Sequence, residues 1–216
     1  MATFALIHGG GGSAWEWQLV TEELRGRGHE AVAVDLPIED ESAGLSDYAD
    51  AVVEAVGERR DLVVVAHSWG GFVGPLVCAR VPANLLVLVT AMIPVPGEAP
   101  ADWWENTGFG HVDIGDPISL FLHDVPGELA EEAMRRGRAQ AGKALHEPWP
   151  LERWPEVPTR FLLCRDDRFF TPGFMRGVVR DRLGITPDEI DGGHAPMLAR
   201  PKELAERLTN YLTGRS

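Results

Sequence analysis

Short apolar runs alternate with segments of helical spacing along most of the chain. The runs that predict buried strands are Thr3–His8, Glu30–Leu36, Asp61–Ala66, Leu85–Thr90, Thr159–Cys164 and the short Glu189–Asp191. The segments that predict helices between and after them are Ala14–Arg27, Ser46–Arg59, Gly70–Arg80, Gly173–Leu183 and Pro201–Leu212. Near-continuous Val and Leu runs separated by helices are typical of parallel strands covered on both faces. The pattern predicts an α/β fold with a mostly parallel, doubly wound sheet of about six strands.

The alternation is interrupted between residues 94 and 157. This stretch is rich in proline and contains four tryptophans, and only Glu128–Ala144 has clear helical spacing. It has too few apolar residues for a core of its own. We therefore expect a single domain over residues 1–216, with 94–157 inserted as a small cap. The cap should cover the carboxyl edge of the sheet, where open α/β sheets bind their ligands.

Charge and composition restrict the partners. The net charge of −13 would be repelled by a nucleic-acid backbone. No apolar stretch reaches the roughly 18–20 residues that cross a bilayer, and a strand begins directly after Met1 without a secretory signal, so we expect a cytoplasmic protein. Lysine occurs only at Lys143 and Lys202 while arginine is plentiful, a bias associated with bacteria of GC-rich genome. The sequence leaves a homodimer open.

A serine follows the third predicted strand directly. That strand runs through Ala66 and His67 into Ser68, and Trp69, Gly70 and Gly71 open the next helix. A serine on a sharp strand-to-helix turn, with small residues two positions before and after it, forms the nucleophile elbow of serine hydrolases. Here those small residues are Ala66, in place of the more usual glycine, and Gly70. Ser68 is therefore the candidate nucleophile, and the helix N-terminus favours developing negative charge.

Four consecutive glycines, Gly9–Gly12, follow the first predicted strand. They could suggest a phosphate-binding loop, but they fit neither G-x-x-x-x-G-K-[ST] nor the dinucleotide pattern with its distant acidic residue. A loop of the H-G-G-G type, which donates backbone N–H groups to an oxyanion, fits better. The N–H groups of Gly10 and Trp69 would then bind the oxyanion, and each such donor typically stabilises the transition state by about 2.7–4 kcal/mol.

A histidine and two aspartates complete the candidate chemistry. His194 lies on a glycine-flanked loop after the last strand, which suits a general base. The acid that orients it should follow Thr159–Cys164, where Asp166 and Asp167 are adjacent. Adjacent loop residues point in different directions, so only one of them can reach His194. That carboxylate would fix the imidazole tautomer and stabilise the imidazolium. No histidines have a zinc-like spacing with a third ligand, and we expect no metal and no cofactor.

Four motifs cover nearly the whole chain. They are H-G-x5-W from His8 to Trp15, H-S-W-G-G from His67 to Gly71, D-x4-P-x-F from Asp167 to Phe174, and G-G-H-x-x-M-L-x-x-P from Gly192 to Pro201. Together they resemble the plant methylesterase and hydroxynitrile lyase branch of the α/β hydrolases and its bacterial relatives. The resemblance implies the α/β-hydrolase fold, and either ester hydrolysis through an acyl-enzyme or cyanohydrin cleavage.

The resemblance also distinguishes between candidate residues. The family's acid precedes the motif's proline by five positions, as Asp167 precedes Pro172, which favours Asp167 over Asp166. The lyases resemble one another in a lysine directly after the catalytic histidine. Ala195 occupies that position here, which favours an esterase. The separation of Ser68 and Asp167 is shorter than is usual in the family, so the cap is expected to be trimmed.

These residues predict a serine esterase that cleaves a small carboxylic ester through a Ser68–His194–Asp167 triad. Two alternatives stay open. One is a triad-scaffold enzyme of secondary metabolism that performs C–C cleavage, a lyase reaction or cyclisation, and the other is a ligand receptor without catalysis. For the cap tryptophans, simple packing on the sheet explains their presence at least as well as substrate contact does. The candidate substrate contacts are Gly9, Ile93, Trp103, Trp104, Phe121, Trp149 and Met197.

Overall fold

A six-stranded parallel sheet forms the centre of the protein, as predicted. The computed structural model describes residues 1–110, 112, 114–140 and 142–214. The strands run in the order β2-β1-β3-β4-β5-β6, and every neighbouring pair is parallel. Their bounds are β1 Thr3–Ile7, β2 Glu30–Val34, β3 Leu62–His67, β4 Leu85–Val89, β5 Thr159–Cys164 and β6 Asp188–Ile190. The order reverses beside β1, and the crevice at such a reversal is where α/β sheets bind ligands.

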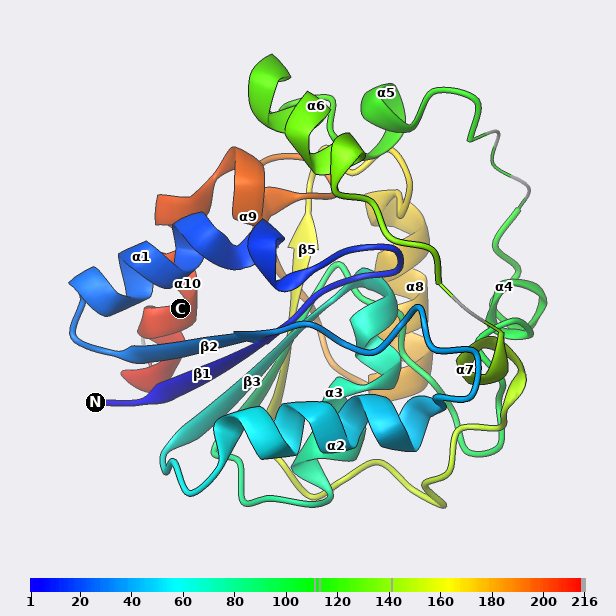
Figure 1. Cartoon of the computed structure of the whole chain (residues 1–216). Coiled ribbons are helices and arrows are strands. Elements are labelled where there is room, and N and C mark those ends of the chain that lie inside the picture. Colours follow the sequence, from blue (N-terminus) through cyan, green and yellow to red (C-terminus); the bar gives the residue numbers. More distant parts are fainter. Residues whose placement is uncertain (111, 113, 141, 215–216) are drawn as a thin grey trace.

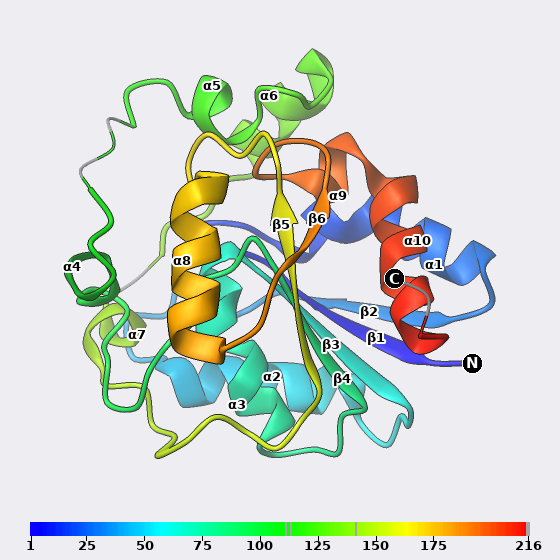
Figure 2. The ribbon, with the colours of Figure 1, turned by 180° about the vertical axis from the view of Figure 1, so that it is seen from behind.

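Helices cover both faces of this sheet. Figure 1 shows α1 and α10 on the opposite side of the strands from α2 and α3, and Figure 2 shows α8 beside β5. Alternate strand residues divide between the two faces, since Phe4 and Leu6 pack towards α1 and α10 whereas Ala5 and Ile7 pack towards α2, α3 and α8. The helix bounds are α1 Gln18–Gly26, α2 Leu45–Val56, α3 Gly74–Cys78, α8 Pro172–Leu183, α9 Pro196–Ala199 and α10 Pro201–Leu212.

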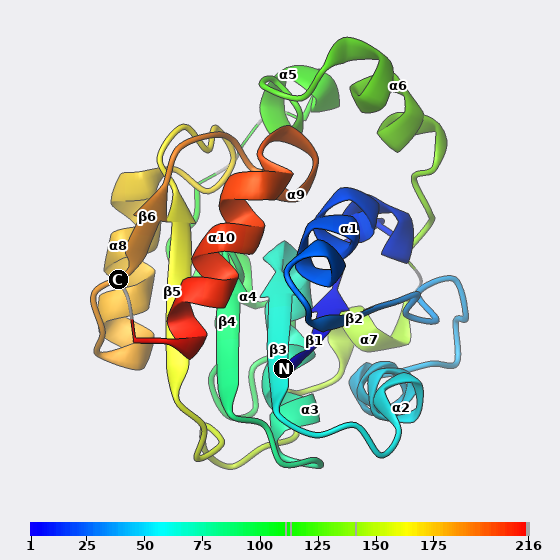
Figure 3. The ribbon, with the colours of Figure 1, turned by 90° about the vertical axis from the view of Figure 1, so that its left-hand side faces the viewer.

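The segment 94–157 connects β4 to β5 and contains four short helices. These are α4 Trp103–Asn106, α5 Pro117–Phe121, α6 Gly127–Arg135 and α7 Lys143–His146. Figures 1 and 2 show α5 and α6 beside each other above the upper end of β5, whereas α4 and α7 both lie at the right-hand side of Figure 1 (Figure 3 gives a third view). The buried side chains of the segment divide between the two cores of the sheet domain. Leu122, Val125 and Ala130 join the core under α1 and α10, while Trp103 and Trp149 join the other core.

Two predicted helices are interrupted, and a third, Ala14–Arg27, begins as the 3-10 helix η1 (Ala14–Trp17) before α1. In place of one helix over Gly70–Arg80, a 3-10 helix η2 (Ser68–Phe72) precedes the shorter α3, whose first turn contains Pro75, a residue without an N–H to donate. The predicted helix Glu128–Ala144 ends with α6 at Arg135, close to the poor helix former Gly137. The next N–H, that of Arg138, donates to the carbonyl oxygen of Gly11 instead of continuing the helix. Residue 141 of that prediction lies outside the described residues.

Candidate active site

The turn after β3 holds Ser68 in a strained backbone conformation, which the closely packed surrounding backbone maintains. Ser68 has φ +50°, in the left-handed region that non-glycine residues rarely adopt. The following glycines are needed for space, because a Cβ at Gly70 would lie 2.7 Å from the carbonyl oxygen of His8. At Gly71 a Cβ would lie 1.8 Å from the carbonyl oxygen of Met92. The strained turn therefore depends on close backbone packing against the ends of β1 and β4.

Three predicted side chains form one hydrogen-bonded chain. Ser68 Oγ lies 3.0 Å from His194 Nε2, and His194 Nδ1 lies 2.8 Å from Asp167 Oδ2. The carboxylate accepts from the Nδ1–H, which leaves Nε2 free to accept the hydroxyl proton of Ser68. All three side chains are buried, with Asp167 at the bottom and Ser68 towards the cavity. The arrangement can pass a proton from Ser68 to a histidine whose positive charge Asp167 would balance.

Three further groups hold the Asp167 carboxylate. The Thr90 hydroxyl donates to Asp167 Oδ2 at 2.6 Å, and the N–H groups of Phe169 and Phe170 each donate to Oδ1 at 2.9 Å. Burial alone would raise the pKa of Asp167, but His194 and these donors outweigh it and hold the pKa below its usual range. Sequence reasoning missed Thr90, a buried residue at φ +38° after β4, since a threonine ending a strand carries no distinctive signal.

The neighbouring Asp166 has a different place. It does not reach His194; its Oδ2 accepts the N–H of Gly192 at 3.0 Å. Asp124, from the segment between α5 and α6, accepts the N–H of Gly193 at 2.8 Å. Two carboxylates therefore fix the backbone directly before His194. Asp166 comes from the loop after β5, and Asp124 comes from the cap.

His67 supports the same loop from the other side. Its Nε2 lies 2.8 Å from the carbonyl oxygen of His194, and a carbonyl can only accept, so the Nε2 carries the proton. His67 also lines the cavity above Ser68. Burial lowers the pKa of His67 to about 3, with the nearby His194 as a smaller cause. His67 is therefore an uncharged part of the cavity wall.

The glycine loop after β1 packs directly against the Ser68 turn. A Cβ at Gly9 would lie 3.0 Å from Ser68 Cβ, and one at Gly10 would lie 3.5 Å from Trp69 Cβ. The N–H of Gly10 has no acceptor among the described residues. Trp69 is the second residue of η2, where backbone N–H groups have no partner inside the helix. The two predicted oxyanion donors thus lie beside each other and beside Ser68.

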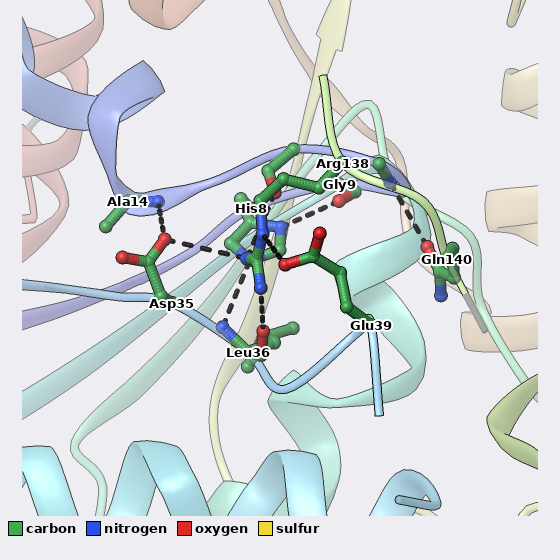
Figure 4. Close-up of polar contacts among 10 residues, drawn as sticks. His8, Gly9, Ala14, Asp35, Leu36, Glu39, Arg138 and Gln140 are labelled. Carbon is green, nitrogen blue, oxygen red and sulfur yellow. Dashed lines mark hydrogen bonds and ion pairs between the residues drawn. The ribbon is translucent and has the colours of Figure 1, made fainter. Parts of the chain in front are cut away.

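The cap fixes this glycine loop by polar contacts (Figure 4). The N–H of Gly11 donates to Gln140 Oε1 at 3.2 Å, while the N–H of Arg138 donates to the Gly11 carbonyl oxygen at 2.8 Å. The Arg138 guanidinium donates to Glu39 at 3.1 Å and to the Leu36 carbonyl oxygen at 3.0 Å. A stretch of the insert therefore ties the loop after β1 to the loop after β2.

A cavity of about 420 Å³ opens above Ser68 and His194. Most of its wall is apolar, and much of that wall comes from the cap and from Phe169. Two charged side chains also reach it, Glu16 from the 3-10 helix η1 (Ala14–Trp17) and Arg138. The apolar side chains are Trp69, Met92, Trp104, Pro117, Phe121, Leu122, Ala133, Met134, Phe169, Ala195 and Leu198.

Three of the seven predicted substrate contacts line this cavity: Gly9, Trp104 and Phe121. Trp103 and Trp149 do not, because both are buried and their indole N–H groups donate to the carbonyl oxygens of Ile93 and Phe72. They pack the cap onto the sheet, as the simpler interpretation held. Ile93 and Met197 are also buried in the cores and do not reach the cavity. The cavity residues that the sequence missed lie mainly in the cap, where no periodic pattern shows which side chains point inward.

Comparison with known proteins identifies the class. The profile of the Alpha/beta hydrolase family matches residues 4–207, so the chain belongs to this family. Methyl jasmonate esterase 1 of Vitis vinifera is 33% identical over 95% of this chain and 94% of its own length. Norfluorocurarine synthase 2 of a Strychnos species is 24% identical over 95% and 93%. The crystal structure of polyneuridine aldehyde esterase shares the fold, with a TM-score of 0.82, 21% identity and coverage of 98% and 99%.

Two other expectations concern metal ions and membranes. In the part of the chain that the structure describes, no group of three or more His, Cys, Asp or Glu side chains is arranged to hold a metal ion. Over the same residues, no helix combines the length and the apolar character that crossing a bilayer requires.

Proposed function

We propose that this protein is a serine carboxylesterase that works through an acyl-enzyme. The observation that carries the proposal is the hydrogen-bonded chain from Ser68 through His194 to Asp167 at the floor of an apolar cavity. The esterase names of two similar proteins, methyl jasmonate esterase 1 and polyneuridine aldehyde esterase, support the proposal.

The reaction follows from the positions of the protons. His194 Nε2 takes the Ser68 proton as the oxygen attacks the ester carbonyl, and Asp167 balances the imidazolium. The N–H groups of Gly10 and Trp69 bind the oxyanion. His194 then gives its proton to the leaving alcohol, and a water molecule hydrolyses the acyl-enzyme with His194 again as the base.

The residue after His194 favours hydrolysis over cyanohydrin cleavage. Ala195 lines the cavity, so this position faces the substrate. A methyl group there offers no positive charge to stabilise a departing anion such as cyanide. An alcohol that leaves with a proton from His194 needs no such charge.

The test uses p-nitrophenyl acetate and a fluorophosphonate. We expect an initial burst of p-nitrophenol and one covalent phosphonyl adduct, located on Ser68 by mass spectrometry. The Ser68→Ala variant should lose both, whereas Ser46→Ala, at an exposed serine on α2, should keep both. Full esterase activity in Ser68→Ala would disprove the proposal. Slow cleavage of esters together with rapid C–C cleavage of a β-keto acid would instead support the non-hydrolytic alternative.

A further inference from the structure

Glu16 brings an unpaired carboxyl group into the cavity that contains Ser68. It lies on η1, directly after the glycine loop, and lines the same cavity as Ser68 and His194. Its carboxylate neither accepts a hydrogen bond nor joins an ion pair with any described residue. An unpaired carboxyl group in a mostly apolar wall does not stabilise the fold, and a smaller apolar residue would serve the fold equally well.

Gly12 provides the space for this carboxyl group. A Cβ at Gly12 would lie 2.7 Å from each of the two Glu16 carboxylate oxygens. Gly12 is not among the residues with positive φ, so the turn itself does not require glycine here. The two residues therefore form one arrangement, in which a side chain at position 12 would push the Glu16 carboxylate from its place.

The arrangement costs stability. Burial raises the pKa of Glu16 to about 7, because the charged form loses water and gains no partner from the protein. Groups with such perturbed ionisation are concentrated at functional sites.

The rest of the cavity suits a cation. The aromatic side chains of Trp69, Trp104 and Phe121 line it, and aromatic faces attract ammonium groups. The one cationic side chain that reaches the described wall, Arg138, is engaged by Glu39 and by backbone carbonyl oxygens. His67 is uncharged, and His194 is paired with Asp167. The net charge of −13 also attracts cations towards the protein.

We infer that the esters taken by this site carry an ammonium group, which Glu16 binds as a counter-ion while the aromatic side chains cover its apolar surface. The inference rests on the proposed esterase function and adds the class of substrate. Since Glu16 lies in the wall and not in the Ser68–His194–Asp167 chain, its contribution is to substrate selection.

Two alcohols of equal shape test the inference without requiring turnover. Choline carries a trimethylammonium group where 3,3-dimethylbutan-1-ol carries a neutral tert-butyl group. Ligand-observed NMR titration at about pH 8, where Glu16 is ionised, should show choline binding about tenfold more tightly to the wild type. This preference should disappear in Glu16→Gln and fall in Gly12→Ala. It should persist in Glu22→Gln, which removes an exposed carboxylate from α1.

Equal binding of the two alcohols by the wild type would overturn the inference, and so would a preference that survives in Glu16→Gln. The hydrolysis of 3,3-dimethylbutyl acetate separates the two proposals. If the wild type cleaves this neutral ester but has no preference for choline, the esterase function stands and the ammonium class fails. Circular dichroism of Glu16→Gln verifies that a lost preference does not reflect misfolding.

Discussion

Replacing Glu16 by glutamine should change how the stability of the protein depends on pH. Burial raises the pKa of Glu16 from 4.5 to about 7. Below about pH 4.5 the carboxyl group is protonated in the folded and the unfolded chain alike, so it adds no pH dependence. As the pH rises from there to 7, the unfolded chain releases the proton first, and the free energy of unfolding falls. Such a rise in pKa corresponds to at most about 3.4 kcal/mol. Because water reaches Glu16 through the open cavity, we expect about 1–2 kcal/mol.

Urea unfolding, followed by tryptophan fluorescence at several pH values between about 5 and 8, measures this difference. At about pH 8 we expect Glu16→Gln to be more stable than the wild type by about 1–2 kcal/mol, and the advantage should shrink as the pH falls below 7. Glu22→Gln should show no such trend. An advantage that stays constant over this range, or a variant that is less stable at pH 8, would refute burial of the charge as the cause.

Three other substitutions test particular contacts. Asp167→Asn should lower kcat for p-nitrophenyl acetate about 10⁴-fold, by analogy with the loss of the orienting acid in other triads. Asp166→Asn should lower kcat less than about tenfold, and equal losses of kcat in the two variants would contradict the assignment. Glu98→Gln removes the buried counter-charge of the partly buried Arg182, a contact of 2.5 Å. It should lower the free energy of unfolding by about 3–5 kcal/mol in a urea titration. Trp104→Ala should shift the ratio of kcat/KM values for p-nitrophenyl butyrate and acetate towards butyrate by about tenfold, because it enlarges the cavity.

The sheet could be predicted from the sequence because its signals are local. Each strand is a short apolar run, and a parallel strand buried on both faces needs no partner pattern to be recognised. The turn at Ser68 could be predicted for a similar reason, since crowding at Gly70 and Gly71 restricts the residue types that fit. The choice of Asp167 over Asp166 depended on the motif spacing around Pro172, because the two side chains differ only in direction.

The cavity wall could not be predicted in the same way. Trp103 and Trp104 are adjacent and chemically identical, yet Trp103 donates to a carbonyl oxygen in the core while Trp104 faces the cavity. Which of them points inward depends on where the chain enters α4, and that depends on contacts far away in the sequence. The position of Glu16 in the cavity wall could not be predicted either, because a single acidic residue beside a glycine run is equally typical of an exposed turn.

The insert is small, yet it contacts both loops on which the proposed chemistry depends. Asp124 accepts the N–H of Gly193 next to His194, and Gln140 accepts the N–H of Gly11 next to the predicted oxyanion donor. Both contacts are made by a side chain to a backbone N–H, so they need only a correctly placed acceptor and no core within the insert. This explains how a cap whose apolar side chains are divided between two cores of the sheet domain can still define the cavity. It follows that the cap positions the two loops as well as covering them.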